Sequence, residues 1–463
     1  MTLSRFSRTF AIVVLVTWAV GLPAAQSRVR ADSVGPGSLS CSPAPCVLPP
    51  TQVSPGPNPD NDPAIVASPA NPRDILVGSN SWNCSLYESL ASYSSVNGGS
   101  SWSDACMHPV FFDGNTYSPD EGPILAYDRN GAAYIAGEYS DSNGDSAIAF
   151  EKSTDSIHWS DSGIALARSG DLPSYCWMAG DTNSGSPYVN SIYVSCVMVG
   201  PPFQFTQNQV VVSHSNDGGR TWHVVNVAPI QNSPEEDFNT AMAVGKDGTI
   251  YVTWMFCINA GVQACGDDKA YMVFSKSADG GNTWSEPTLI AKVTLIHPIP
   301  NTVGAVASNI PAIAVDASDR AYSGNLYVVM YNWTGTFMQV QVVRSTDDGD
   351  TWSKPTPVAP GITHDQFLPW IAVSPTGLVG VVWLDRRNDP TDTAYQAFAG
   401  ISTDGGLSFQ PNVQLTTAFS KIGTGWGGYD GATWDGANYF LAAWMDNSQT
   451  KYIQDYVGGI RLK

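Results

Sequence analysis

Short apolar runs of three to five residues recur along the chain in pairs, and each pair is joined by a turn rich in Gly, Asp, Asn and Pro. In one pair, residues 124–127 read Ile-Leu-Ala-Tyr and residues 133–136 read Ala-Tyr-Ile-Ala. Apolar runs this short, bounded by turn residues, are typical of buried β-strands. Seven such pairs begin near residues 63, 124, 177, 241, 312, 371 and 431. The pattern predicts an all-β chain.

A second repeated unit, an octet of the form S-x-D-x-G-x-T-W, lies between the strand pairs. Strict copies begin at Ser215, Ser277 and Ser345, and looser copies begin at Ser95, Ser153 and Ser402. Successive serines are 58, 62, 62, 68 and 57 residues apart, a period typical of a propeller or a similar array. The Asp side chain can bond nearby backbone amides and the glycine supplies positive φ, so each octet predicts a hairpin turn.

The octets resemble the Asp box of the sialidase superfamily, and we use that name for them. The resemblance implies a β-propeller in which the boxes are structural and the ligand binds on the opposite face. The strand pairs then supply the inner strands A and B of each blade, and each box joins the outer strands C and D.

Seven strand pairs and six boxes predict a seven-bladed β-propeller of four-stranded antiparallel blades. The last pair is followed only by residues 452–461, enough for one strand, so the N-terminal lead-in is expected to supply the strand that closes the ring. Residues 26–463 number 438, which corresponds to 7.1 repeats at the mean box spacing of 61.4. A six-bladed propeller, the usual form in sialidases, is the alternative.

Three segments are predicted in order along the chain. Residues 1–25 are typical of a signal peptide, with Arg5 and Arg8 before an apolar stretch of 13 residues that is too short to span a membrane. Residues 26–59 form a lead-in rich in Pro and Ser, and residues 60–463 form the propeller. We therefore expect a secreted, extracellular protein without a membrane span.

Cysteine usage and charge agree with export. All eight cysteines follow the signal segment, and proximity pairs Cys41 with Cys46, Cys84 with Cys106, Cys176 with Cys196, and Cys257 with Cys265. Eight cysteines allow 105 pairings, so proximity is the only basis for this prediction. The net charge of −19 argues against a nucleic-acid partner, and we expect a monomer that binds a glycan or glycoconjugate.

Candidate site residues follow from the predicted faces, because the starts of A strands and the ends of B strands lie opposite the boxes. These positions are rich in carboxylates, and paired carboxylates are what glycoside hydrolysis requires. By blade order, three residues stand where the resemblance implies the acid/base, the glutamate and the tyrosine of the superfamily: Asp120, Glu236 and Tyr429. The predicted substrate-binding residues are Glu121, Trp177, Asp237, Asp365, Asp385, Arg386, Arg387 and Asp430.

The arginine clamp of sialidases is not apparent. That family grips the substrate carboxylate with three arginines, the first in an F/Y-R-I-P motif, and this motif is absent here. Only Arg168, Arg386 and Arg387 fall where they would reach the predicted site. The leading hypothesis is a secreted glycoside hydrolase, either sialidase-like or of the carboxylate-pair type. The alternative is a non-catalytic propeller that binds carbohydrate or protein.

No cofactor is required for either function. Calcium is the metal that an acidic face would attract, but the sequence holds no EF-hand loop and the metal ligands are unknown.

Overall fold

The computed structural model describes residues 28–29, 45–85, 89–168, 170–200, 206–259, 265–302, 308–423 and 426–462. The predicted signal peptide, residues 1–25, lies outside the described residues.

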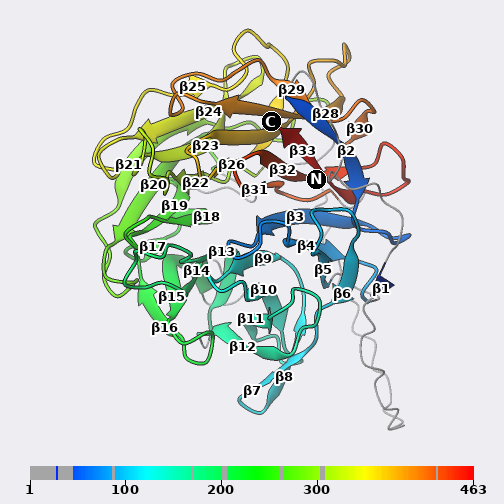
Figure 1. Ribbon diagram of the computed structural model, residues 1–463. Coiled ribbons are helices and arrows are strands. Elements are labelled where there is room, and N and C mark those ends of the chain that lie inside the picture. The colour runs from blue at the N-terminus through cyan, green and yellow to red at the C-terminus, as the bar shows by residue number, and fades with distance from the viewer. Residues whose placement is uncertain are drawn as a thin grey trace, which may run out of the picture.

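Seven antiparallel sheets stand around a common axis, and they are numbered here as blades 1 to 7 (Figure 1). Blade 1 holds β3 (Asp60–Ala67), β4 (Ile75–Ser81), β5 (Leu90–Ser95) and β6 (Ser103–Cys106), with β1 (Arg28–Val29) beside β6. Blade 2 holds β9 (Ile124–Tyr127), β10 (Ala133–Ser140), β11 (Ser146–Ser153) and β12 (Asp161–Leu166), with the hairpin β7 (Val110–Phe112) and β8 (Asn115–Pro119) added beside β10.

Blades 3 and 4 follow. Blade 3 holds β13 (Leu172–Gly180), β14 (Ile192–Gly200), β15 (Gln207–Ser215) and β16 (His223–Asn226), with β17 (Gln231–Asn232) also paired to β15. Blade 4 holds β18 (Glu236–Val244), β19 (Ile250–Cys257), β20 (Lys269–Ser277) and β21 (Thr288–Thr294).

The last three blades complete the ring. Blade 5 holds β22 (Ala312–Val315), β23 (Leu326–Trp333), β24 (Met338–Ser345) and β25 (Thr356–Pro357). Blade 6 holds β26 (Gln366–Val373), β27 (Val379–Asp385), β28 (Ala394–Ser402) and β29 (Val413–Gln414), with β30 (Ser420–Lys421) also paired to β28. Blade 7 holds β31 (Gly431–Asp435), β32 (Tyr439–Asp446), β33 (Gln454–Arg461) and β2 (Cys46–Gln52). The prediction of seven four-stranded blades is confirmed, and the six-bladed alternative is wrong.

Blade 7 joins the two ends of the chain. Its outermost strand, β2, runs antiparallel to β33, with Val47 opposite Ile460 and Gln52 opposite Tyr456. Because β2 precedes blade 1 and β33 ends the ring, this pairing closes the propeller without leaving the last strand unpaired.

An aromatic cluster fills the axis. Trp177 on β13 of blade 3 meets Trp370 on β26 of blade 6, with ring centroids 4.2 Å apart. Tyr429, which precedes β31 of blade 7, stands edge-on to Trp177 at 5.7 Å. Side chains from blades 3, 6 and 7 therefore pack against one another.

The six Asp boxes each join the third and fourth strands of blades 1 to 6, as predicted. In the blade 5 box, Asp347 Oδ1 accepts hydrogen bonds from the Thr351 amide at 2.9 Å and from Ser345 Oγ at 2.7 Å. Gly349 (φ 87°) lies against Phe274 of blade 4, and Trp352 meets the same ring edge-on at 5.5 Å. The box therefore also ties neighbouring blades together.

Three predicted disulfides are confirmed: Cys84 to Cys106, Cys176 to Cys196, and Cys257 to Cys265. Cys176 to Cys196 joins the two inner strands of blade 3, with Cα atoms 4.1 Å apart. Cys46 is also disulfide-bonded, and its predicted partner, Cys41, lies outside the described residues.

Candidate functional site

The inner strands of four blades carry a β-bulge at the end opposite the boxes. A residue with positive φ marks each bulge, where the register to the next strand shifts: Asp62, Tyr175, Asn239 and Leu368. A bulge turns a side chain away from the regular alternation of a strand. The bulges therefore redirect side chains at this face, which we call the mouth face.

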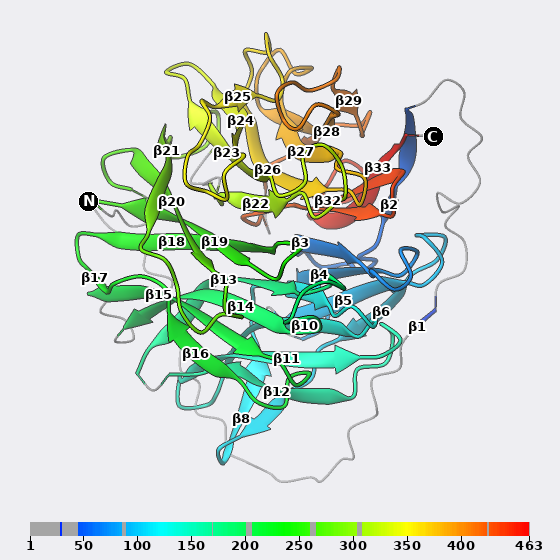
Figure 2. The same cartoon turned by 60° about the vertical axis from the view of Figure 1, so that its left-hand side comes forward.

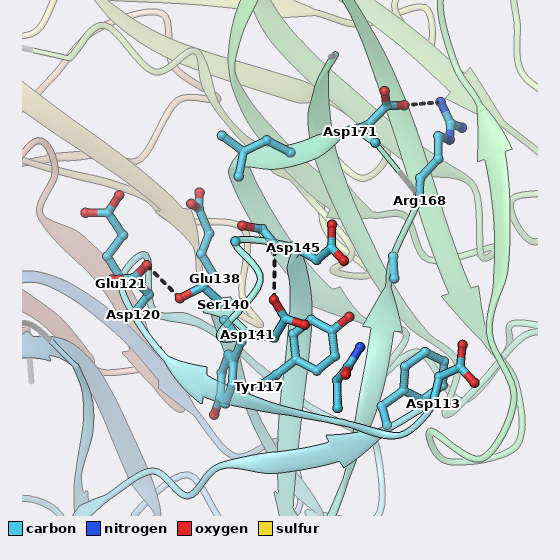
Figure 3. A pocket seen from close by; sticks show the side chains of 18 residues that line it. Asp113, Tyr117, Asp120, Glu121, Glu138, Ser140, Asp141, Asp145, Arg168 and Asp171 are labelled. Carbon is cyan, nitrogen blue, oxygen red and sulfur yellow. Dashed lines mark hydrogen bonds and ion pairs between the residues drawn. The ribbon is translucent and has the colours of Figure 1, made fainter. Parts of the chain in front are cut away.

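A cavity of about 490 Å³ opens on the mouth face of blade 2 (Figure 3). Its walls are the β7–β8 hairpin, the end of β10, the turn between β10 and β11, and residues 167–168 and 170–172. Seven carboxylates line it: Asp113, Asp120, Glu121, Glu138, Asp141, Asp145 and Asp171. Arg168 is the basic residue among the described lining residues, so the cavity is strongly acidic.

Three of these carboxylates stand together where the first strand of blade 2 is interrupted between β8 and β9. The Asp120 amide donates to Glu138 O at 2.9 Å, and the Glu138 amide donates to Glu121 O at 2.8 Å. Ser140 Oγ donates to Asp120 Oδ2 at 3.5 Å. Backbone pairing thus holds Asp120, Glu121 and Glu138 as neighbours in one wall (Figure 3).

The environment of the two glutamates, Glu138 and Glu121, raises their pKa values. Burial raises the pKa of Glu138 well above its ordinary value and the charge of Glu121 raises it further, while a hydrogen bond with Ser174 acts in the opposite direction. The pKa of Glu121 is also raised, by partial burial and by the charge of Asp120. A carboxyl that keeps its proton at neutral pH is able to act as a general acid.

Tyr175 and Glu236 extend the acidic wall toward blades 3 and 4. The Tyr175 side chain is 43% exposed, and its backbone carbonyl accepts a hydrogen bond from Thr240 Oγ1 at 2.8 Å. Burial together with the charges of Glu236, Glu138 and Glu121 raises the pKa of Tyr175 to about 12. Burial raises the pKa of Glu236 to about 7. The charges of glutamates from blades 2 and 4 therefore both act on the Tyr175 hydroxyl.

Sequence reasoning missed Glu138 and Tyr175. Glu138 had a signal, because it is a charged residue in the apolar run from Ala133 to Tyr139. Tyr175 had none, since its exposure depends on a bulge that the sequence does not reveal.

The structure places the third predicted catalytic residue, Tyr429, in the axial cluster with the predicted Trp177. The Tyr429 hydroxyl donates to Pro123 O at 2.9 Å. Its amide donates to Asp62 Oδ1 at 3.0 Å. The ring and the hydroxyl are both held by protein neighbours.

Two predicted aspartates are enclosed in the inner-strand ends. Asp237 is 1% exposed and accepts a hydrogen bond from Trp254 Nε1 at 2.8 Å. Asp430 is also 1% exposed and accepts one from the Met445 amide at 3.2 Å. Neither presents an open carboxylate to a ligand in this arrangement.

The arginines expected near the site are paired. Arg386 is fully buried, and its Nη1 donates to Pro300 O at 2.7 Å and to Asp365 at 3.2 Å. Arg387 Nη2 donates to Asp385 Oδ2 at 2.6 Å.

Arg168 Nη2, on the cavity wall, donates to Asn226 Oδ1 at 3.0 Å. Arg168 follows the last strand of blade 2, whereas Arg386 and Arg387 both follow β27 of blade 6, and the three do not form a joint clamp in the described structure.

Two further features bear on ligands and location. Within the described ranges, no three His, Cys, Asp or Glu side chains are grouped so that they would hold a metal ion, and the calcium prediction stays untested. The described part of the chain contains no helix with the length and apolarity needed to cross a bilayer.

Comparison with known proteins gives one match by sequence and several solved structures with a similar fold. No protein-family model matches the chain. A sialidase from Micromonospora viridifaciens is 28% identical over 218 residues, which cover 44% of this chain and only 31% of that longer protein.

Among solved structures, an ulvan lyase of polysaccharide lyase family PL25 superposes with a TM-score of 0.51 and 15% identity, over 88% of this chain and 95% of its own. A second solved structure, described as a Hadza microbial sialidase, superposes with a TM-score of 0.46 and 13% identity, over 80% of this chain and 77% of its own. The partial sequence match to a sialidase, on a seven-bladed β-propeller, confirms the resemblance to the sialidase superfamily that the Asp boxes indicated.

Proposed function

We propose that this protein is a secreted glycoside hydrolase of the carboxylate-pair type, with its active site in the acidic cavity of blade 2. The observation that carries the proposal is the position of Glu138, a carboxyl in the cavity wall beside Asp120 whose pKa burial raises well above its ordinary value. Glycosidases use two carboxyl groups in different protonation states, and neighbouring carboxyls whose environments separate their pKa values suit those roles.

Glu138 is assigned as the general acid. It donates its proton to the glycosidic oxygen as the bond to the anomeric carbon breaks, and water supplies the hydroxyl group and the proton that complete hydrolysis. Asp120, which is exposed and accepts a hydrogen bond from Ser140, is assigned as the second carboxylate, which assists attack at the anomeric carbon. Glu236 is outside the cavity lining, so this proposal gives it a supporting role only. Tyr429 has no nucleophilic role in this proposal because its hydroxyl is committed to Pro123 O.

The expected substrate is a neutral glycan. Seven carboxylates line the cavity, and an anionic sugar would meet like charge there. Recognition of a sugar carboxylate favours bidentate arginine donors, and Arg386 and Arg387 are already paired with Asp365 and Asp385. These features favour a carboxylate-pair hydrolase over sialidase activity, although the relative in sequence is named a sialidase.

Disulfide bonding supports the secreted location. The described residues contain three complete disulfides, and such bonds persist in oxidising compartments.

The proposal is tested by incubating the purified protein with chromogenic glycosides of neutral sugars and with a sialoside. Hydrolysis of a neutral glycoside is expected, and Asp120→Asn should lower turnover about 10²-fold, the usual size of an acid/base contribution. Hydrolysis of the sialoside alone would overturn the substrate class. Tight glycan binding without any hydrolysis would identify a binding propeller instead.

A further inference from the structure

The β7–β8 hairpin carries two exposed phenylalanines in succession at the edge of the cavity. Phe111 is 73% exposed and Phe112 is 44% exposed, both next to the turn at Asp113 and Gly114. The hairpin projects from the rim of blade 2 (Figures 1 and 2). One exposed aromatic needs no explanation in a soluble protein, but two at the tip of an ordered hairpin call for a partner.

The hairpin is fixed to the blade. Val110 and Tyr117, opposite each other in the hairpin, are 3% and 7% exposed, so its base is part of the core. β8 pairs with β10 through Pro119 and Tyr139. The aromatic rings at the tip are therefore presented by a supported element, as a binding platform requires.

The two phenylalanines differ in the direction they face. Successive residues of a strand point to opposite sides, and Phe112 lines the cavity that holds Glu138, whereas Phe111 does not. One continuous cavity thus has the acid candidate on one wall and an aromatic face on another. At about 490 Å³ it falls in the size range of pockets that take ligands larger than a single sugar.

We propose that Phe112 forms a subsite, away from the bond that is cleaved, in which a sugar ring of a neutral oligosaccharide packs on the aromatic face. The inference deepens the proposed function and rests on it for the position of the cleaved bond. A pyranose ring offers an apolar C–H face to Phe112, and its hydroxyls donate to the surrounding carboxylates. The protein is then selective for oligosaccharides over glycosides of one sugar.

Binding of fluorescently labelled oligosaccharides tests this subsite without requiring turnover. The probes are neutral gluco-, xylo-, manno-, arabino- and N-acetylglucosamine series of two and six units, titrated into the full chain in a Glu138→Gln background. Phe112→Ser should weaken binding of a six-unit ligand about fivefold to tenfold, the scale of one aromatic contact, and leave the two-unit ligand unchanged. Phe112→Trp should restore the affinity.

Phe111→Ser is the matched control, since it removes a neighbouring and more exposed ring from the same hairpin without touching the cavity. It should leave both affinities unchanged. Equal losses in the two variants, no loss in Phe112→Ser, or no binding of any six-unit probe would overturn the subsite. Binding that depends on Phe112 in a wild-type protein that hydrolyses nothing would uphold the subsite and reject the proposed hydrolase.

Discussion

The two faces of the propeller shift the pKa values of their carboxyl groups in opposite directions. On the box face, hydrogen bonds from the Thr351 hydroxyl and amide and from Ser345 lower the pKa of Asp347 to about 2. On the mouth face, burial raises the pKa of Asp237 and of Glu236 to about 7. The chemistry of an aspartate or glutamate here depends on whether donors or apolar neighbours surround it, since the residue type is the same.

The contrast has a structural origin. A box places an aspartate among the amides of its own turn, so local sequence alone supplies the donors. The mouth face instead collects carboxyls from the inner-strand ends of different blades, and neighbouring acids such as Glu235 and Glu236 raise the pKa of Asp237 further. The box face is thus built for stability, while the mouth face retains groups that are costly to ionise, as functional sites often do.

The largest expected effect is that a substitution on the mouth face lowers activity, whereas one on the box face lowers stability. Glu138→Gln keeps the side-chain size but removes the acidic proton, so turnover should fall about 10²-fold while the thermal midpoint stays the same or rises. Asp347→Asn should do the reverse, because it weakens the bonds that hold the blade 5 box and lies away from the cavity. Steady-state kinetics and calorimetry on both variants measure this. A comparable loss of turnover in Asp347→Asn would break the division of roles.

The next largest effect is the loss of stability when alanine replaces either of two glycines that share a φ of 87°. A Cβ at Gly349, in the blade 5 box, would lie 2.4 Å from the Phe274 ring of blade 4, whereas a Cβ at Gly144, in the β10–β11 turn, would meet nothing within 4 Å. Gly144→Ala should cost about 1 kcal/mol through backbone strain alone, and Gly349→Ala about 2 to 4 kcal/mol because overpacking adds to it. Urea unfolding of the two variants gives the difference. Equal costs would mean that the box does not tie the blades together.

The sequence predicted the box face better than the mouth face, for a physical reason. Ser345, Asp347 and Gly349 act on one another within five residues, so their turn can be read from the chain. The blade count followed from apolar strand pairs, which is also a local signal.

The mouth face depends on contacts across blades. Asp120 and Glu121 were predicted and line the cavity, but the exposure of Tyr175 comes from a positive-φ bulge. Arg386 was expected to face a ligand at the mouth, yet it is buried and donates a hydrogen bond to the backbone carbonyl of Pro300, a residue 86 positions earlier. A local sequence pattern does not reveal contacts between residues so far apart in the chain.

The smallest expected effect concerns how stability depends on pH. The pKa of Asp237 is raised from 3.8 to about 7, so the folded protein binds this proton more tightly than the unfolded chain. Its stabilising contribution is complete below pH 4 and is lost as the pH rises through 7. The lowered pKa of Asp347 acts in the opposite sense, with stability present above pH 4 and lost as the pH falls toward 2. The protein should therefore be most stable in mildly acidic solution.

Asp237→Asn isolates the mouth-face contribution. The amide oxygen of Asn keeps an acceptor for Trp254 Nε1 and carries no charge at any pH. The wild type should lose stability between pH 5 and pH 8. The variant should still lose some stability, because Asp60 and Asp365 are also buried carboxyls with raised pKa values. Its loss should be smaller than that of the wild type by on the order of 1 kcal/mol, because it lacks the titration of Asp237. Urea midpoints at the two pH values measure the difference. Identical pH profiles would show that Asp237 is ionised in the folded state, and the contrast between the faces would then fail at this residue.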